Sequence, residues 1–247
     1  MNRAGGPFYH LRALHAARRR WQPFREAIGA FLVESFPSAT SLIVVGPSAA
    51  YCIPDAFLAR FSAVTALEPD RVARFLFARR LKRLGVPSID FVVEDRLVAP
   101  LVSGGPGLDS LLDASPGRAV LFSNVLGQIR FLLSAPDFQK WQAGWTQRVA
   151  SRLAGRPWAS FHDRVSAAVP PRVAMPHRTF RRLEDAELGR FFYSEREGRV
   201  ELYDHLTDGL FPVEAPHAYF HWELEPGAHH LVEGVRSTAP EPQVTDP

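Results

Sequence analysis

The stretch "SLIVVGPSAA", residues 41–50, decides the fold of this chain. Its first half is a continuous apolar run, which is typical of a strand buried on both faces of a parallel sheet. Gly46 ends the run, and the small residues Ser48 and Ala50 follow at alternating positions. The pattern predicts a strand that turns tightly into a helix. It leaves open whether the turn binds a cofactor or is an ordinary connection.

Strand-like and helix-like segments alternate beyond this turn. Apolar runs predict further strands within residues 63–70, 88–95, 118–129 and 157–166, and three-to-four-residue periodicity predicts helices over 54–61, 70–85 and 137–155. Residues 102–117 are rich in Gly and Pro and are expected to form a loop. Such alternation is typical of an open parallel sheet covered by helices on both faces.

The two ends of the chain differ from this pattern. Residues 9–36 predict two helices that are divided near Pro23, and residues 218–235 predict an antiparallel hairpin around a Pro-Gly turn. We therefore predict an α/β fold with a doubly wound, mostly parallel sheet of about seven strands, a C-terminal antiparallel hairpin and an N-terminal helical cap. The expected units are a cap over 1–40, one Rossmann-like domain over 41–236 and a disordered tail over 237–247.

Composition limits the classes of partner and the compartment. The chain has 247 residues with 46% hydrophobic and 22% charged, as in an ordinary globular protein, and a formal charge of +3 does not indicate a nucleic-acid binder. Cys52 is the only cysteine, which excludes an internal disulfide and a multi-cysteine zinc site. Arginines interrupt the N-terminal stretch before an apolar run develops, so we expect no signal peptide, no membrane span and a cytoplasmic protein.

Small and acidic residues stand where three predicted strands end, which is where doubly wound sheets bind ligands. Glu68 follows Gly46 by about 20 residues, the separation at which a nucleotide-binding sheet places a carboxylate on ribose hydroxyls. The alternative role for Glu68 is a charge at a helix N-terminus, and for Asp95 with Arg96 it is a surface ion pair. The candidate cofactor-binding residues are Gly46, Pro47, Ser48, Ala50, Glu68, Asp95 and Arg96.

The motifs "VVGPSAA" (44–50), "ALEPD" (66–70) and "VVEDRL" (92–97) together resemble the class I S-adenosylmethionine-dependent methyltransferases. The resemblance covers residues 41–235 and implies that the first loop wraps the methionine moiety, that Glu68 holds the ribose and that Asp95 meets the adenine. Val44 stands where the family usually has an acidic residue, and the loop has one glycine where the family favours more. A degenerate copy without methyl transfer therefore stays open.

The acceptor side is expected at the ends of the fourth and fifth strands. We take Asn124, His162 and Asp163 as candidate catalytic residues, because an amide can hold an acceptor and a histidine beside a carboxylate can act as general base. Neighbouring residues point to opposite faces of a strand, so His162 and Asp163 cannot be assumed to pair. Each of the three also has a plain structural alternative, in a turn or as a satisfied buried group.

A metal site is not predicted, although several histidines are close in the sequence. Asp204, His205 and Asp208 precede His217, His221, His229 and His230, but none has a recognised ligand spacing. Packing within a hairpin is the favoured interpretation. Cys52 has no evident histidine partner and is expected to be buried rather than nucleophilic.

The leading hypothesis is methyl transfer from S-adenosylmethionine to a small molecule. The alternative is a catalytically inactive methyltransferase-like protein that serves as a binding or assembly subunit, with the crevice blocked by Tyr51, and a nicotinamide-dependent reductase is a third. A small-molecule substrate is expected, and a protein partner or a homodimer stays open.

Overall fold

The computed structural model describes residues 7–17, 19–192 and 201–238. Their strands form one sheet in the order β3-β2-β1-β4-β5-β9-β8-β6, and β7 pairs with the far end of β5. The strands in chain order are β1 Ser41–Val45, β2 Ala63–Leu67, β3 Ser88–Val92, β4 Ala119–Ser123, β5 Trp158–Ala167, β6 His177–Thr179, β7 Tyr203–Asp204, β8 His217–Glu225 and β9 Ala228–Arg236.

The sheet has a parallel half and an antiparallel half. Strands β1 to β5 run parallel, and β1 lies between β2 and β4, so the winding reverses direction beside β1. The parallel pairing of β4 with β5 ends at Ser123 and Phe161, but β5 continues and pairs antiparallel with β9 along its whole length. Ligands bind at such a reversal point, outside the carboxyl ends of the strands.

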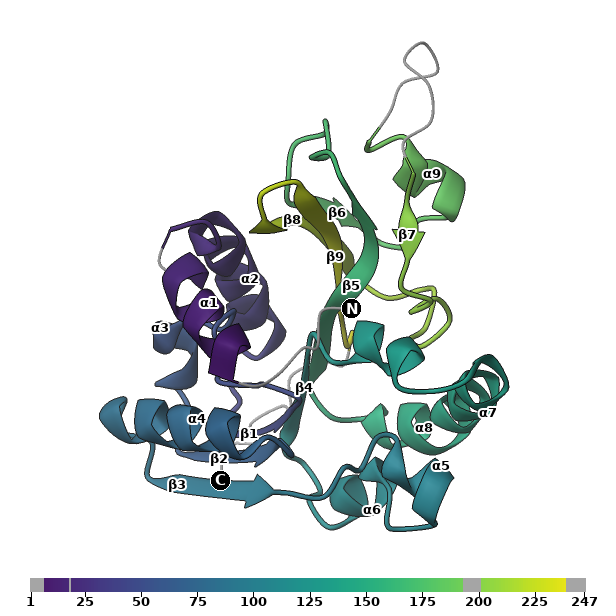
Figure 1. The fold of residues 1–247 in the computed structure, drawn as a ribbon. Coiled ribbons are helices and arrows are strands. Elements are labelled where there is room, and N and C mark those ends of the chain that lie inside the picture. Colours follow the sequence, from purple (N-terminus) through teal and green to yellow (C-terminus); the bar gives the residue numbers. More distant parts are fainter. Residues whose placement is uncertain (1–6, 18, 193–200, 239–247) are drawn as a thin grey trace, which may run out of the picture.

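Helices cover both faces of the sheet (Figure 1). Helices α1 to α4 lie on one side and α5 to α8 on the other. The helical segments are α1 Pro7–Ala17, α2 Gln22–Ser35, α3 Asp55–Leu58, α4 Arg71–Arg83, α5 Ala99–Ser103, α6 Leu108–Asp113, a 3-10 turn η1 Leu126–Phe131, α7 Ala135–Trp145, a π-helical turn η2 Thr146–Ala150, α8 Ser151–Leu153 and α9 Asp185–Gly189. Among the described residues, no helix is both long and apolar enough to cross a bilayer.

The N-terminal cap packs on the antiparallel hairpin rather than standing apart from the sheet. Phe24 of α2 stacks on Trp222 of β8 with ring centroids 5.1 Å apart, and Trp21 donates its indole N–H to the carbonyl of Leu224. Phe31 packs edge-on against Phe220, 5.6 Å away. These aromatic contacts bury large apolar surfaces and fix the cap on β8.

A β-bulge in β5 changes the direction of its side chains. The pairing with β9 shifts between Asp163 and Val165, so Arg164 occupies an extra position in the strand. A bulge shifts the alternation of faces by one residue. Consequently Asp163 and Ser166, three positions apart, share the face that also carries Phe161 and His230.

The predicted fold is confirmed in its main features. The doubly wound sheet, the closing hairpin with its turn at Gly227 (φ 72°) and the two-helix cap are all present, and Asp70 caps α4 by accepting from the N–H groups of Val72 and Ala73. The expected loop over 102–117 is wrong in part, because α6 forms there around the buried Leu108 and Leu112. The short strands β6 and β7 were not predicted.

The expected C-terminal tail falls largely on residues 239–247, which lie outside the described residues. Ser237 is described, and it accepts from the N–H of Trp158 through its hydroxyl oxygen, 3.2 Å away. Its own N–H donates to the carbonyl of Trp158 at 2.9 Å. The chain is therefore held to β5 for at least one residue beyond β9.

Candidate functional site

The loop after β1 has the backbone of a glycine-rich turn with only one glycine in it. Gly46, Ser48 and Ala50 have φ values of 64°, 51° and 57°, in the left-handed region that glycine adopts without strain. A Cβ on Gly46 would lie 2.5 Å from Cβ of Val125, which follows β4. Ser48 and Ala50 therefore keep the conformation expected of the missing glycines, and Gly46 permits the loops after β1 and β4 to touch.

The guanidinium group of Arg80, in α4, anchors the loop after β1. It donates to the carbonyls of Ala50 and Ile53 and forms an ion pair with Asp55, 2.6 Å from Nε to Oδ1. Burial lowers the pKa of Arg80 from its usual value, and the nearby Asp55 charge counteracts this shift. Two backbone carbonyls and one carboxylate thus replace the water that the buried cation would otherwise bind.

Glu68 joins the ends of β1 and β2. Its buried carboxylate accepts from the N–H of Ser48 at 2.7 Å through Oε2 and from the N–H of Asp70 at 2.9 Å through Oε1. Burial raises the pKa of Glu68, and the two backbone hydrogen bonds act in the opposite direction. Both expected roles are compatible with this position, because Glu68 organises the turn before α4 and also faces the first loop.

Helix α1 lies across the same edge. Its residue His10 has Nδ1 3.0 Å from the hydroxyl of Tyr51 and Nε2 3.8 Å from Oδ2 of Asp70. Burial raises the pKa of Tyr51 to about 12, so its phenol is neutral at physiological pH. Tyr51 therefore faces α1, and the cap meets the first loop and the start of α4 together.

Asp95 and Arg96, at the end of the third predicted strand, have different hydrogen-bond partners. Oδ1 of Asp95 accepts from the N–H groups of Leu97 and Val98, 2.8 and 3.0 Å away, and so shapes the turn before α5. Arg96 donates to the hydroxyl of Ser110 and lies 3.6 Å from Glu94. The two residues do not form the surface pair that was weighed as the alternative.

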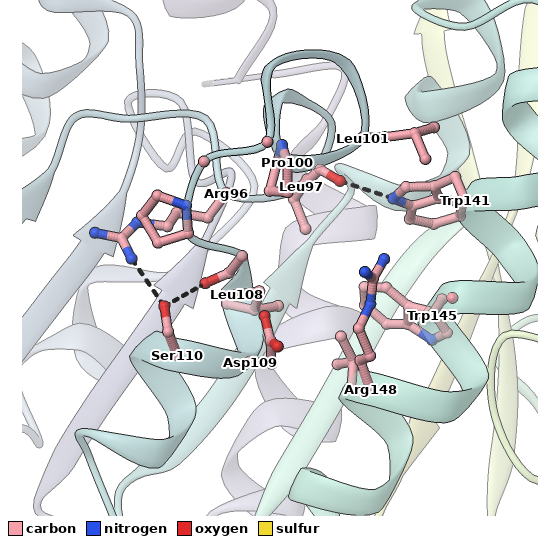
Figure 2. A pocket seen from close by; sticks show the side chains of 16 residues that line it. Arg96, Leu97, Pro100, Leu101, Leu108, Asp109, Ser110, Trp141, Trp145 and Arg148 are labelled. Carbon is pink, nitrogen blue, oxygen red and sulfur yellow. Dashed lines mark hydrogen bonds between the residues drawn. The ribbon is translucent and has the colours of Figure 1, made fainter.

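Arg96 also lines a cavity of about 410 Å³ between the α5–α6 segment and α7. Figure 2 shows Trp141, Trp145 and Arg148 on the wall opposite Asp109 and Ser110, with the indole N–H of Trp141 bonded to the carbonyl of Leu97. The sequence does not indicate this cavity, because residues 102–117 are expected to form a loop and α6 forms there instead. None of the other predicted cofactor residues lines it.

Asn124 and Asp163 meet where β4 ends. Asn124 has a left-handed φ of 52°, accepts from the N–H of Asp163 at 2.9 Å and donates from Nδ2 to the Asp163 carboxylate at 3.3 Å. Burial opposes the charge of Asp163, but His230, 3.0 Å away, outweighs it, and the pKa of Asp163 falls to about 2. The two predicted residues therefore form one unit on the α1–α4 side of the sheet.

His162 points to the opposite side. Its Nδ1 lies 2.9 Å from the hydroxyl of Ser160 and its Nε2 lies 3.5 Å from Oε2 of Glu233. Oε1 of Glu233 is also bonded to His217 and to the hydroxyl of Tyr219, each at 2.8 Å. His162 thus belongs to a buried polar network within β5, β8 and β9, on the face of β5 opposite Asp163.

His230, which is expected to pack within the hairpin, and His205, which the sequence places on no element, lie beside Asp163. His230 of β9 bonds to it directly, and the ring of His205, just after β7, lies 5.7 Å from the ring of His230 at an interplanar angle of 46°. His221 and His229 form a separate pair, with Nε2 and Nδ1 3.0 Å apart. The sequence held no spacing signal for the first group, because its members come from three distant segments. Cys52 is half-buried rather than fully buried as expected, and burial raises the pKa of its thiol to about 12.

Comparisons with known proteins give distant structural likenesses. No protein-family model and no curated protein sequence matches the chain. The N-methyltransferase NodS from Bradyrhizobium japonicum WM9 in complex with S-adenosyl-L-homocysteine is 14% identical, with 92% of this chain and 99% of that chain covered and a TM-score of 0.43. The N-terminal domain of EvdMO1 with S-adenosyl-L-homocysteine bound is 13% identical over 94% and 85%, with a TM-score of 0.41.

A third similar structure is that of CalS10 with S-adenosylmethionine bound, an amino pentose methyltransferase from Micromonospora echinaspora. It is 13% identical, with 90% of this chain and 72% of that chain covered and a TM-score of 0.38. At this level of likeness, the function has to be argued from the residues of this chain.

Proposed function

We propose that this chain binds S-adenosylmethionine at the carboxyl edge of β1, β2 and β4 and takes part in methyl transfer to a small molecule. The observation that carries the proposal is the contact of the Glu68 carboxylate with the N–H of Ser48, 2.7 Å apart. It brings the acidic residue after β2 to the small-residue loop after β1, beside the point where the strand order reverses. That is the arrangement by which doubly wound sheets hold an adenosine-containing cofactor.

The residues present fit such a cofactor. The loop after β1 has a left-handed backbone at Gly46, Ser48 and Ala50 and carries only small side chains at the last two, as a loop that approaches a ligand through its backbone requires. Glu68 offers carboxylate oxygens for ribose hydroxyls, and Asp95 lies at the next strand end, where we expect the adenine. When bound, S-adenosylmethionine supplies a methyl group on a positively charged sulfur.

The contribution of the protein to this chemistry is placement and proton removal. Asn124 follows β4, and Asp163 lies within β5 just beyond its parallel pairing with β4, next to the loop that Gly46 brings close. Asp163 bonded to His230 forms a carboxylate–imidazole pair, which can orient an acceptor and take up a proton from its hydroxyl or amine. We therefore assign the acceptor to this side, and we replace His162 by His230 as the histidine that faces it.

The first test is calorimetric titration with S-adenosylmethionine and S-adenosylhomocysteine. We expect micromolar binding that weakens about tenfold in Glu68→Gln, the loss expected for one hydrogen bond to a charged group. Glu94→Gln is the matched control, since its side chain is 69% exposed at the end of the next strand. Equal weakening in both variants would contradict the role of Glu68.

The second candidate is a binding or assembly subunit without catalytic activity. It is favoured by a specific observation: both carboxylate oxygens of Glu68 already accept backbone N–H groups, and Tyr51 meets His10 of the cap at the same edge. Absence of binding to both ligands, together with a discrete dimer or complex on a sizing column, would support it. Binding of NAD⁺ instead would support the reductase.

The compartment is a separate part of the proposal. The free thiol of Cys52 favours a reducing compartment such as the cytoplasm.

A further inference from the structure

Three side chains from distant segments meet beside the end of β4. Asp163 comes from β5, His205 follows β7 and His230 comes from β9. One ligand-type atom from each lies within 4.8 Å of the other two, and no other group of three or more His, Cys, Asp and Glu residues in the described part of the chain is placed so. Oδ1 of Asp163 and Nδ1 of His230 are already 3.0 Å apart.

The orientation of His205 is fixed by the backbone. Its Nδ1 lies 3.3 Å from the carbonyl oxygen of Gly127, so the proton of a neutral ring belongs on Nδ1, where it is donated to that carbonyl. Nε2 then carries the lone pair, and it lies 3.2 Å from the hydroxyl of Ser166. A histidine that gives one N–H to a backbone carbonyl and carries a lone pair on the other nitrogen has the usual environment of a metal ligand, and here the Ser166 hydroxyl would yield its hydrogen bond with that lone pair to the ion.

The carboxylate of Asp163 is also held in place by its neighbours. Asn124 holds Asp163 by two hydrogen bonds, one to the side chain and one from its N–H. Gly127 permits the close approach, because a Cβ there would lie 3.0 Å from the carbonyl oxygen of Asp163. The bulge at Arg164 turns Asp163 and Ser166 to the same face as His230. These features preorganise the group, and outer contacts of this kind set the geometry of metal ligands.

We propose that Asp163, His205 and His230 bind a divalent transition-metal ion, with Zn²⁺ as the ion that the ligand set fits best. Two imidazoles and one carboxylate are a common protein ligand set for Zn²⁺, and three protein ligands leave a coordination position open. Ligands about 2.1 Å from one ion lie about 3 to 3.5 Å from each other, so the Asp163–His230 pair already has the required separation. The ligand atom of His205 lies within 4.8 Å of the other two, so binding of the ion requires this ring to move closer.

The open position gives the site a role that rests on the proposed function. Asn124, which holds Asp163, stands at the end of β4 on the side assigned to the acceptor. A bound Zn²⁺ there would coordinate an oxygen of the acceptor and favour loss of its proton to solvent, in place of proton uptake by Asp163 and His230, which would then be metal ligands. The substrate class that this chemistry selects is a hydroxyl- or carboxylate-bearing small molecule.

The test is a titration of the metal-stripped full-length protein with Zn²⁺, without S-adenosylmethionine. We expect one Zn²⁺ per chain, and a loss of affinity of at least about 100-fold in His205→Gln, His230→Gln and Asp163→Asn, more than the loss of an outer contact causes. His229→Gln is the matched control, because His229 neighbours His230 on the same strand but bonds to His221. Co²⁺ absorption gives a second readout, since its visible bands report nitrogen and oxygen ligands directly in the wild-type chain.

Three results would overturn the site: no Zn²⁺ bound by the wild type, undiminished binding in all three ligand variants, or loss of binding in His229→Gln. If a ligand variant fails to fold, the wild-type Co²⁺ spectrum and the perturbation of the His205 and His230 ring resonances by Zn²⁺ still decide the matter. Since no cofactor is present, failure here is distinguishable from failure of the proposed S-adenosylmethionine binding. Binding of Zn²⁺ without binding of S-adenosylmethionine would keep the site and remove its role in methyl transfer.

Discussion

The loops after β1, β2 and β3 and the strands of the hairpin region, β5, β8 and β9, use polar side chains in opposite ways. In the loops, the carboxylates of Glu68 and Asp95 bind backbone N–H groups and so determine the shape of the chain. In the hairpin region, carboxylates bind other side chains, as Asp163 binds His230 and Glu233 binds His217. The first region is therefore expected to be sensitive to changes of backbone shape, and the second to changes of charge.

The largest effect is expected from Gly46→Ala in the first region. The new Cβ would have to occupy space 2.5 Å from Cβ of Val125 while the residue keeps a φ of 64°. Left-handed strain and overpacking each cost about 1–3 kcal/mol, so we expect the free energy of unfolding to fall by about 3 kcal/mol or more. Chemical denaturation measures it.

Gly85→Ala is the control for this variant. Gly85 also has a left-handed φ, 76°, but a Cβ there meets nothing within 4 Å. It should lose only the conformational part, about 1 kcal/mol. Equal losses in the two variants would mean that the contact of the loop with Val125 is unimportant, and that the first region does not depend on its shape at this point.

The next effect is expected from Glu233→Gln in the hairpin region. Burial opposes the Glu233 charge, but hydrogen bonds with His162 and His217 outweigh this and lower its pKa well below the usual value of 4.5. Removing the charge while keeping the shape should reduce the free energy of unfolding by about 2 kcal/mol at neutral pH, within the range for hydrogen bonds to charged groups. Glu223→Gln on the same hairpin is the control, because its 3.6 Å contact with Arg20 is at the surface and such pairs contribute about 0–1 kcal/mol.

The pH dependence has a definite sign for Glu233. Its folded pKa is below its unfolded pKa, so its stabilisation is present above about pH 4.5 and is lost as the pH falls below that value. The difference in unfolding free energy between the wild type and Glu233→Gln should therefore shrink on acidification. A difference that stays constant down to about pH 3 would show that shape rather than charge holds this network.

These two regions also differ in how well the sequence predicted them. The first region follows from local patterns, because Gly46, Glu68 and Asp70 each stand at the end of an apolar run or the start of a helix, and the main chain carries their interactions. The left-handed backbone of Ser48 and Ala50 could be inferred only from the spacing of small residues. No local preference of Ser or Ala indicates it.

The hairpin region was predicted as an element but not as a site. Asp163 could be chosen as a polar residue in an apolar strand, yet its partners depend on the bulge at Arg164 and on the antiparallel pairing with β9. One extra residue in a strand moves the following side chains to the other face, and nothing in "SFHDRVS" indicates where that residue lies. His162 precedes the bulge and faces away from Asp163 by ordinary strand alternation, and the histidine that does face Asp163, His230, comes from β9 and is not marked by any local pattern.

The smallest expected effect is the pH dependence that Glu68 causes. Its carboxyl group can be compared directly with that of Glu233 in the hairpin region. Burial raises its pKa, in contrast to Glu233. The carboxylate form is the better acceptor for ribose hydroxyls, so the affinity for S-adenosylmethionine should fall as the pH falls through the folded pKa of Glu68, above 4.5. The effect on folding has the opposite sign, because the stabilisation by a raised pKa is present at low pH and is lost as the pH rises through the folded value. Titration calorimetry and thermal unfolding between about pH 5 and about pH 8, each referred to Glu68→Gln, should therefore change in opposite directions by small amounts. If both changed in the same direction, Glu68 would behave like the carboxylates of the hairpin region. The distinction between a region governed by backbone shape and one governed by charge would then not hold for Glu68.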